Sequence, residues 1–111
     1  MEPTIAHIVV FITTRSRQEA EAIGQVLVES RLAACVNISA GVRSIFRWQG
    51  AIENQEEALM LAKSRSDLLP SIIEVVKRLH SYTVPEVVAL PILAGSSDYL
   101  TWVDESLRQT P

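Results

Sequence analysis

The sequence has few of the residues that would place it in a specialised class. Its 111 residues include one cysteine, Cys35, so a disulfide framework within the chain is excluded and a reducing compartment is expected. Ten basic residues against 13 acidic ones give a net charge of −3, without the basic stripe that nucleic acids require. There is neither an apolar run long enough to span a membrane nor a charged signal-peptide start. We therefore expect a cytoplasmic protein with no nucleic-acid or membrane partner.

Apolar residues, by contrast, are abundant for so short a chain. Residues 1–111 are expected to form one domain, and folding at this length buries roughly two-thirds of the surface of the unfolded chain. With 48% hydrophobic and only 21% charged residues, the chain carries more apolar surface than one small core accounts for. We expect part of that surface to lie in an interface between subunits.

Residues 5–30 carry the signals of a strand followed by a helix. The run over residues 5–13 is apolar and β-branched, which is typical of a central strand buried on both faces. Ser16 and Glu19 then match a capping box, and apolar residues recur at helical spacing as far as Ser30. The prediction is a buried strand that leads directly into an amphipathic helix.

A long hairpin is predicted next. Residues 33–48 are rich in β-branched and aromatic side chains, and Gly41 indicates a bulge among them. Gln49 and Gly50 offer a tight reversal before a return strand over residues 51–64. A hairpin of this length overhangs a small sheet, so its protruding arm is expected to need a partner.

The last third of the chain predicts a helix, a strand and a closing helix. The first helix should end near His80, and the strand is expected over residues 87–93. Four polar residues can cap these helices, namely Ser66 or Asp67 for the first and Ser97 or Asp98 for the second. The resulting order, β, α, β, β, α, β, α, begins with a split βαβ repeat. It predicts an α+β fold in which two helices cover one face of a four-stranded antiparallel sheet.

Four separated segments carry a resemblance to a known family. They read LAACVN at 32–37, SIFRWQG at 44–50, HSYTVPEVVALPI at 80–92 and DYLTWV at 98–103. In this order they resemble the CutA family, the divalent-cation tolerance proteins. The resemblance implies a ferredoxin-like βαββαβ subunit with a long hairpin between its second and third strands and an extra C-terminal helix. It also implies a compact homotrimer in which the hairpins pack between neighbouring subunits.

The resemblance further implies a response to divalent metal ions, with copper bound by some members. Here Ile12 and Leu79 stand where those members have a cysteine and a histidine ligand. His80 and Glu86 remain as candidate metal ligands for Cu(II) or another divalent ion, weakly bound and completed by another subunit or water. The alternative for His80 is a structural role at the helix C-terminus, where the helix dipole favours a protonated imidazole.

A ligand cleft between subunits is also implied by the resemblance. Its candidate residues, besides Glu86, are Trp48, Lys63, Tyr82, Tyr99 and Trp102. The function that we expect is that of a non-enzymatic trimer in divalent-metal tolerance, acting by metal binding or as a stable scaffold.

Two other functions remain open. One is a ligand-sensing trimer comparable to the PII signalling proteins, which would bind a small anion in the cleft. The other is an enzyme similar to the acylphosphatases, which would use Arg15 or Arg17 with Asn37. Because residues 13–17 lack the glycines that wrap backbone amides around a phosphate, we expect no catalytic activity.

Overall fold

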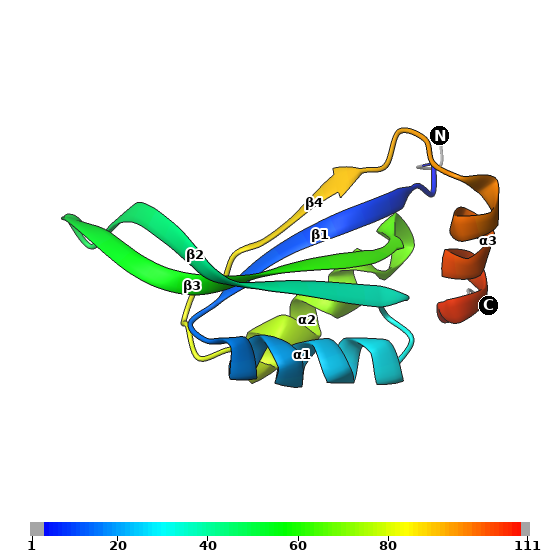
Figure 1. Cartoon of the computed structure of the whole chain (residues 1–111). Helices are drawn as coiled ribbons and strands as arrows, with labels where there is room; N and C mark the ends of the chain where they lie inside the picture. Colours follow the sequence, from blue (N-terminus) through cyan, green and yellow to red (C-terminus); the bar gives the residue numbers. More distant parts are fainter. Residues whose placement is uncertain (1–3, 110–111) are drawn as a thin grey trace.

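The predicted alternation of strands and helices forms a four-stranded antiparallel sheet with three helices (Figure 1). The computed structural model describes residues 4–109. The strands are β1 (His7–Thr14), β2 (Cys35–Trp48), β3 (Ala51–Arg65) and β4 (Val87–Pro91), and the helices are α1 (Arg17–Glu29), α2 (Leu69–Leu79) and α3 (Ser97–Ser106). The strand order β2-β3-β1-β4 confirms the ferredoxin-like α+β fold with a long hairpin and an added helix. Within the described part of the chain, each helix is too short or too polar to cross a membrane.

Helix α1 begins at the capping residues that the sequence predicted. The side-chain oxygen of Ser16 accepts a hydrogen bond from the backbone N–H of Glu19 at 3.1 Å. The carboxylate of Glu19 accepts from the N–H of Arg15 at 3.2 Å, one residue earlier than a capping box requires. The cap therefore ties the end of β1 to the first turn of α1.

The predicted caps of the other two helices are wrong. Ser66 Oγ instead accepts from the backbone N–H of Ala6, 60 residues away, and Asp67 binds the guanidinium of Arg65. Helix α2 follows a 3-10 turn over Ser66–Leu68, has a proline in its first turn and lacks a side-chain cap. Helix α3 starts after Ser96, again with no side-chain cap. A distant partner occupies Ser66, which local sequence cannot reveal, whereas the partner of Asp67 is Arg65, only two residues before it.

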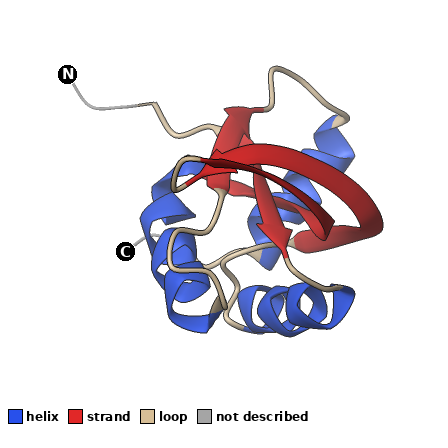
Figure 2. Cartoon of the chain, turned by 90° about the vertical axis from the view of Figure 1, so that its left-hand side faces the viewer, coloured by secondary structure: helices blue, strands red, loops and turns tan. Residues whose placement is uncertain are grey.

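The hairpin of β2 and β3 extends well beyond the rest of the sheet. Strand β1 pairs with β3 only over residues 58–65, so the arm formed by residues 42–57 projects past it (Figure 1). Gly41, with φ of 77°, lies in the bulge between Ser39 and Val42, as predicted. Figure 2, viewed from the end where this arm projects, shows how strongly its two strands curve.

The predicted reversal at the tip of the hairpin is confirmed. Gln49 and Gly50 have φ values of 49° and 81°, so both central residues of the turn are left-handed. This conformation gives a two-residue turn the twist that the flanking strands require, and glycine adopts it without steric cost.

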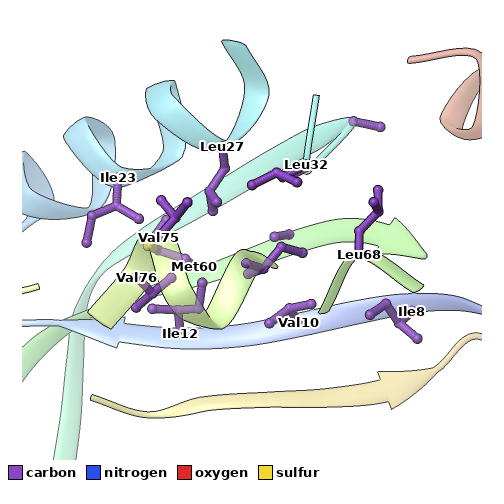
Figure 3. Packing of buried hydrophobic residues seen from close by; sticks show 14 of the residues in the cluster. Ile8, Val10, Ile12, Ile23, Leu27, Leu32, Met60, Leu68, Val75 and Val76 are labelled. Carbon is purple, nitrogen blue, oxygen red and sulfur yellow. The ribbon is translucent and has the colours of Figure 1, made fainter. Parts of the chain in front are cut away.

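The core lies between one face of the sheet and helices α1 and α2 (Figure 3). Alternate side chains of β1 point into it, and the residues between them are only half-buried. The prediction that β1 is buried on both faces therefore holds for one face of the isolated chain. The labelled side chains of Figure 3 that meet there from four elements are Ile8, Val10 and Ile12 of β1, Ile23 and Leu27 of α1, Met60 of β3 and Val76 of α2.

The opposite face of the sheet is apolar and largely open. Val9 and Phe11 of β1 pair with Leu90 and Val88 of β4. Val88 is 53% exposed and Leu90 54% exposed, whereas Val9, Phe11 and the neighbouring Leu61 of β3 are half-buried. A contiguous apolar surface of this kind on a small protein indicates an interaction site.

The ion pair between Arg65 and Asp67 predicts a pH-dependent contribution to stability. Its guanidinium donates two hydrogen bonds to the carboxylate, at 2.9 and 3.2 Å, and a third to the carbonyl of Arg108. These bonds lower the pKa of Asp67, against the opposing effect of burial. The stabilisation is therefore complete above the unfolded-state pKa of about 3.9 and is lost as pH falls through the lower folded-state pKa.

We expect Asp67→Asn to reduce the free energy of unfolding by about 1–3 kcal/mol at neutral pH, since a mostly buried charged hydrogen bond is lost. The difference from wild type should shrink as urea denaturation is repeated at pH values below about 4. Glu74→Gln, on the exposed face of α2, is the matched control and should have little effect. A difference that is the same at neutral and at strongly acidic pH would show that the ion pair contributes nothing through charge.

Candidate functional site

His80 lies where the end of α2 meets the end of β1. Its Nε2 is 2.7 Å from the backbone carbonyl oxygen of Thr13, and its Nδ1 accepts a hydrogen bond from the backbone N–H of Tyr82 at 3.0 Å. Both contacts are satisfied only when the ring is neutral and carries its proton on Nε2. The side chain is 9% exposed. In this arrangement His80 acts as a structural joint that fixes the start of the loop over residues 80–86.

Tyr82 directs this loop onto the hairpin. Its hydroxyl donates a 2.7 Å hydrogen bond to Oε2 of Glu57, and its ring lies 4.7 Å from the ring of His80. Burial, followed by the hydrogen bond and the charge of Glu57, raises the pKa of Tyr82 to about 12. The phenol therefore stays protonated over the physiological range and acts as a donor to Glu57.

Glu19 holds the same loop from the side of α1. Its Oε2 accepts a hydrogen bond from the backbone N–H of Ser81 at 2.8 Å, while Oε1 accepts from Arg15. Burial alone would raise the pKa of Glu19, but these hydrogen bonds outweigh it and lower the pKa. Residues from β1, α1 and β3 thus converge to position one short loop.

A groove of about 820 Å³ runs between this loop and the projecting arm of the hairpin. Of the predicted site residues, Trp48, Tyr82 and Glu86 line it. The rest of the lining includes apolar side chains such as Ile45 and Phe46, and the charged side chains of Arg15, Glu53 and Glu57. Uncharged polar residues complete it, among them Ser44, Gln55 and Thr83. The structure therefore gathers half of the predicted cleft around one cavity within a single chain.

The other half of the predicted cleft lies at a different place on the sheet. Lys63 is six residues from Glu57 along β3, which corresponds to about 20 Å of strand. Its ammonium donates to the side-chain oxygen of Asn37. Tyr99 and Trp102 of α3 stack at a centroid distance of 5.6 Å, and burial together with nearby Cys35 raises the pKa of Tyr99. In one chain these three residues form a second cluster.

Glu57 is the site residue that the sequence reasoning missed. It directly precedes the apolar run over residues 58–62, and the period of two that places Leu59 and Leu61 on the open face also places Glu57 there. The alternation was therefore a usable signal. What it lacked was any indication that Tyr82, 25 residues later, would cover the carboxylate.

The candidate metal ligands lie in different surroundings. His80 has both ring nitrogens engaged, while Glu86 is exposed at the groove. Among residues 4–109, histidine, cysteine and carboxylate side chains nowhere form a group of three or more able to hold a metal ion. Within these residues, His80 and Glu86 therefore belong to no cluster of three such side chains.

Comparison with known proteins agrees with this architecture. A family profile described as CutA1 divalent ion tolerance protein matches residues 8–106. The chain belongs to the CutA1 family. The resemblance seen in the four sequence segments is thereby confirmed.

Two relatives and one solved structure illustrate the breadth of the CutA1 family. The divalent-cation tolerance protein CutA of Thermus thermophilus is 51% identical over 98 residues, covering 88% of this chain and 95% of the relative. The chloroplastic CutA protein of Arabidopsis thaliana is 41% identical over 95% of this chain but only 58% of its own length. The structure of the T. thermophilus protein Cut A1 matches with a TM-score of 0.90 at 49% identity, covering 92% and 99% of the two chains.

The acylphosphatase-like arrangement is not assembled in this CutA1-family chain. Arg15 lines the groove and directly follows β1. Asn37 of β2 pairs with Leu61 of β3, which in turn pairs with Phe11 of β1, four residues before Arg15. The amide oxygen of Asn37 is moreover occupied by Lys63. The two side chains proposed for catalysis therefore serve different parts of the sheet.

The Tyr82–Glu57 hydrogen bond can be tested by titrating the phenol. In a Tyr99→Phe background, where Tyr82 is the single tyrosine, we expect its pKa of about 12 to fall in Glu57→Gln because the negative charge is removed. Burial should keep the value above the ordinary one. Ultraviolet absorbance of the phenolate measures the midpoint. Glu56→Gln, at the exposed neighbouring position, is the control; an equal midpoint in all three proteins would exclude the assigned coupling.

Proposed function

We propose that the chain is a non-enzymatic homotrimer that takes part in tolerance of divalent metal ions, acting as a stable scaffold with weak metal binding. The family name is the link to divalent ions. The observation that carries the assembly is the open apolar face of the sheet, on which Val88 and Leu90 are more than half exposed. In a trimer this face would be covered by other copies of the chain.

The projecting hairpin supports the same assembly. Ile45, Trp48 and Ile52 on the arm are exposed in the single chain, and an isolated two-stranded arm gains little stability from its own pairing. Contact between a neighbouring subunit and Ile52 would bury part of this apolar surface and hold the arm in place. The apolar residues that one small core cannot bury would then lie in the interface between subunits.

We propose His80 and Glu86 as the chain's contribution to a weak metal site. A metal ion at Nδ1 of His80 would replace the hydrogen bond from Tyr82, and that exchange reduces the net affinity. Glu86 is exposed and can bind without such a cost. Cu(II) is the divalent ion whose affinity for nitrogen and oxygen ligands is highest, so it is the natural probe.

The cytoplasm is the location that we propose. The single cysteine agrees with a reducing compartment. The chloroplastic relative in Arabidopsis thaliana indicates that members of the family are used in more than one compartment.

A second candidate function is ligand sensing by a PII-like trimer. The groove of about 820 Å³ favours it, because its volume falls within the range of small-molecule sites. One wall is the loop over residues 80–86, which His80, Glu19 and Glu57 hold by single hydrogen bonds. Ligand binding at this wall would alter the loop and thereby report the ligand to a partner.

The assembly is tested by placing a charge on the open face of the sheet. We expect wild-type protein to have the mass of three chains in native mass spectrometry and Leu90→Asp to dissociate, because burying an unpaired carboxylate in an apolar interface is costly. Val28→Asp, on the exposed side of α1, is the matched control and should remain trimeric. Trimeric Leu90→Asp would place the interface elsewhere, and a monomeric wild type would remove the proposed assembly.

The metal contribution is tested by copper titration of metal-free protein. We expect Glu86→Gln and His80→Ala to reduce copper affinity by roughly tenfold or more, the size of effect seen even for residues that only orient a ligand. His7→Ala is the control, since His7 pairs with Asp104 away from the groove. Isothermal titration calorimetry and native mass spectrometry measure affinity and assembly together. Unchanged isotherms for both variants would leave the scaffold role without this metal site.

A further inference from the structure

Glu57 carries a carboxylate that is buried without an ion pair among the described residues. The residue is 6% exposed, and its Oε2 accepts the hydrogen bond from Tyr82. Its Oε1 has neither a hydrogen bond nor an ion pair within residues 4–109, where the ion pairs involve other residues. In that part of the chain every fully buried side-chain nitrogen or oxygen has a partner. Oε1 must therefore keep an accessible surface, and Glu57 lines the groove.

The groove as a whole has a negative charge. Glu53, Glu57 and Glu86 line it, and Arg15 is the one basic side chain among the lining residues. Oε1 of Glu57 has no donor among the described residues, so a cationic ligand can donate a charge-assisted hydrogen bond to it.

The wall opposite the loop is apolar and aromatic. Phe46 and Trp48 of the hairpin are both more than one-third exposed, as is Ile45 beside them. Aromatic faces, that of tryptophan above all, attract cations, and they also pack against an apolar body. The groove thus combines a buried anionic group with a surface suited to the hydrocarbon part of a ligand.

We propose that this groove is a binding site for a small organic cation, a primary ammonium attached to an apolar or aromatic body. The ammonium would contact Oε1 of Glu57, with Glu86 near it, and the body would lie against Phe46 and Trp48. Tyr82 keeps Glu57 in place through the hydrogen bond to Oε2. This ligand class differs from metal ions and from small anions, and the proposal does not depend on metal binding.

The test uses the full chain, freed of metal with a chelator and then dialysed. 2-Phenylethylammonium is the probe, and 2-phenylethanol, of similar size but uncharged, is the matched ligand. Calorimetry should show the ammonium binding at least about tenfold more tightly than the alcohol, which is the effect of one charge-assisted hydrogen bond. Backbone amide NMR shifts should cluster in residues 44–57 and 80–86.

Variants identify the group that recognises the charge. Glu57→Gln, which keeps an acceptor for Tyr82, should weaken binding of the ammonium by about tenfold and leave the alcohol unchanged. Glu56→Gln makes the same change of charge at the adjacent exposed position and should bind as wild type does. Trp48→Leu should weaken both ligands. If Glu57→Gln fails to fold, as near-ultraviolet circular dichroism would show, Glu86→Gln at its exposed position replaces it.

Three results would overturn the proposal. They are equal affinity for the ammonium and the alcohol, undiminished ammonium binding by the folded glutamine variant, and absence of binding to wild-type protein. The last result, together with protection of residues 44–57 from hydrogen exchange in the assembled protein, would show that a second copy fills the groove. Copper titration and mass spectrometry on the same samples report separately on the metal-tolerance function, so either hypothesis can fail without the other.

Discussion

Helices α1 and α2 cover only one face of the sheet, and most of the remaining structure follows from this one-sided covering. Ile8, Val10 and Ile12 find their partners among the helices, whereas Val9 and Phe11 on the alternate positions do not. A strand with apolar residues on both faces cannot be fully buried by one layer of helices. The long hairpin extends the same open face beyond the end of the core, and there the loop after α2 meets it. Both the proposed interface and the groove are consequences of this geometry.

Features encoded by neighbouring residues could be predicted from the sequence, and features made by distant pairs could not. Ser16 with Glu19, Gly41 in its bulge, and Gln49 with Gly50 are signals within a few residues, and all three are found in the structure. The predicted cap of α2 by Ser66 failed because the backbone N–H of Ala6, 60 residues away, donates to its side chain. The same limit applies to the site. The alternation of β3 placed Glu57 on the open face, but only the fold brings Tyr82 to it.

The surroundings of His80 show that this residue by itself does not indicate a metal site, although the chain belongs to the CutA1 family. The sequence offered two readings of this residue, a metal ligand and a protonated cap at the helix end. The structure adds a third, in which a neutral ring joins Thr13 to Tyr82 through both nitrogens. A histidine in this position stabilises the loop whether or not a metal is present. His80 therefore has a structural role in this chain that is independent of metal binding.

The charge of the groove favours a cation over an anion as the ligand of the proposed site. An anion was the natural expectation while Lys63 was placed in the same cleft as Tyr82 and Glu86. Within one chain, however, Lys63 lies about 20 Å from Glu57 along β3 and donates a hydrogen bond to Asn37. The lining of the groove contains three carboxylates and a single arginine. An anion there would meet a buried negative charge at close range, whereas a cation would relieve it.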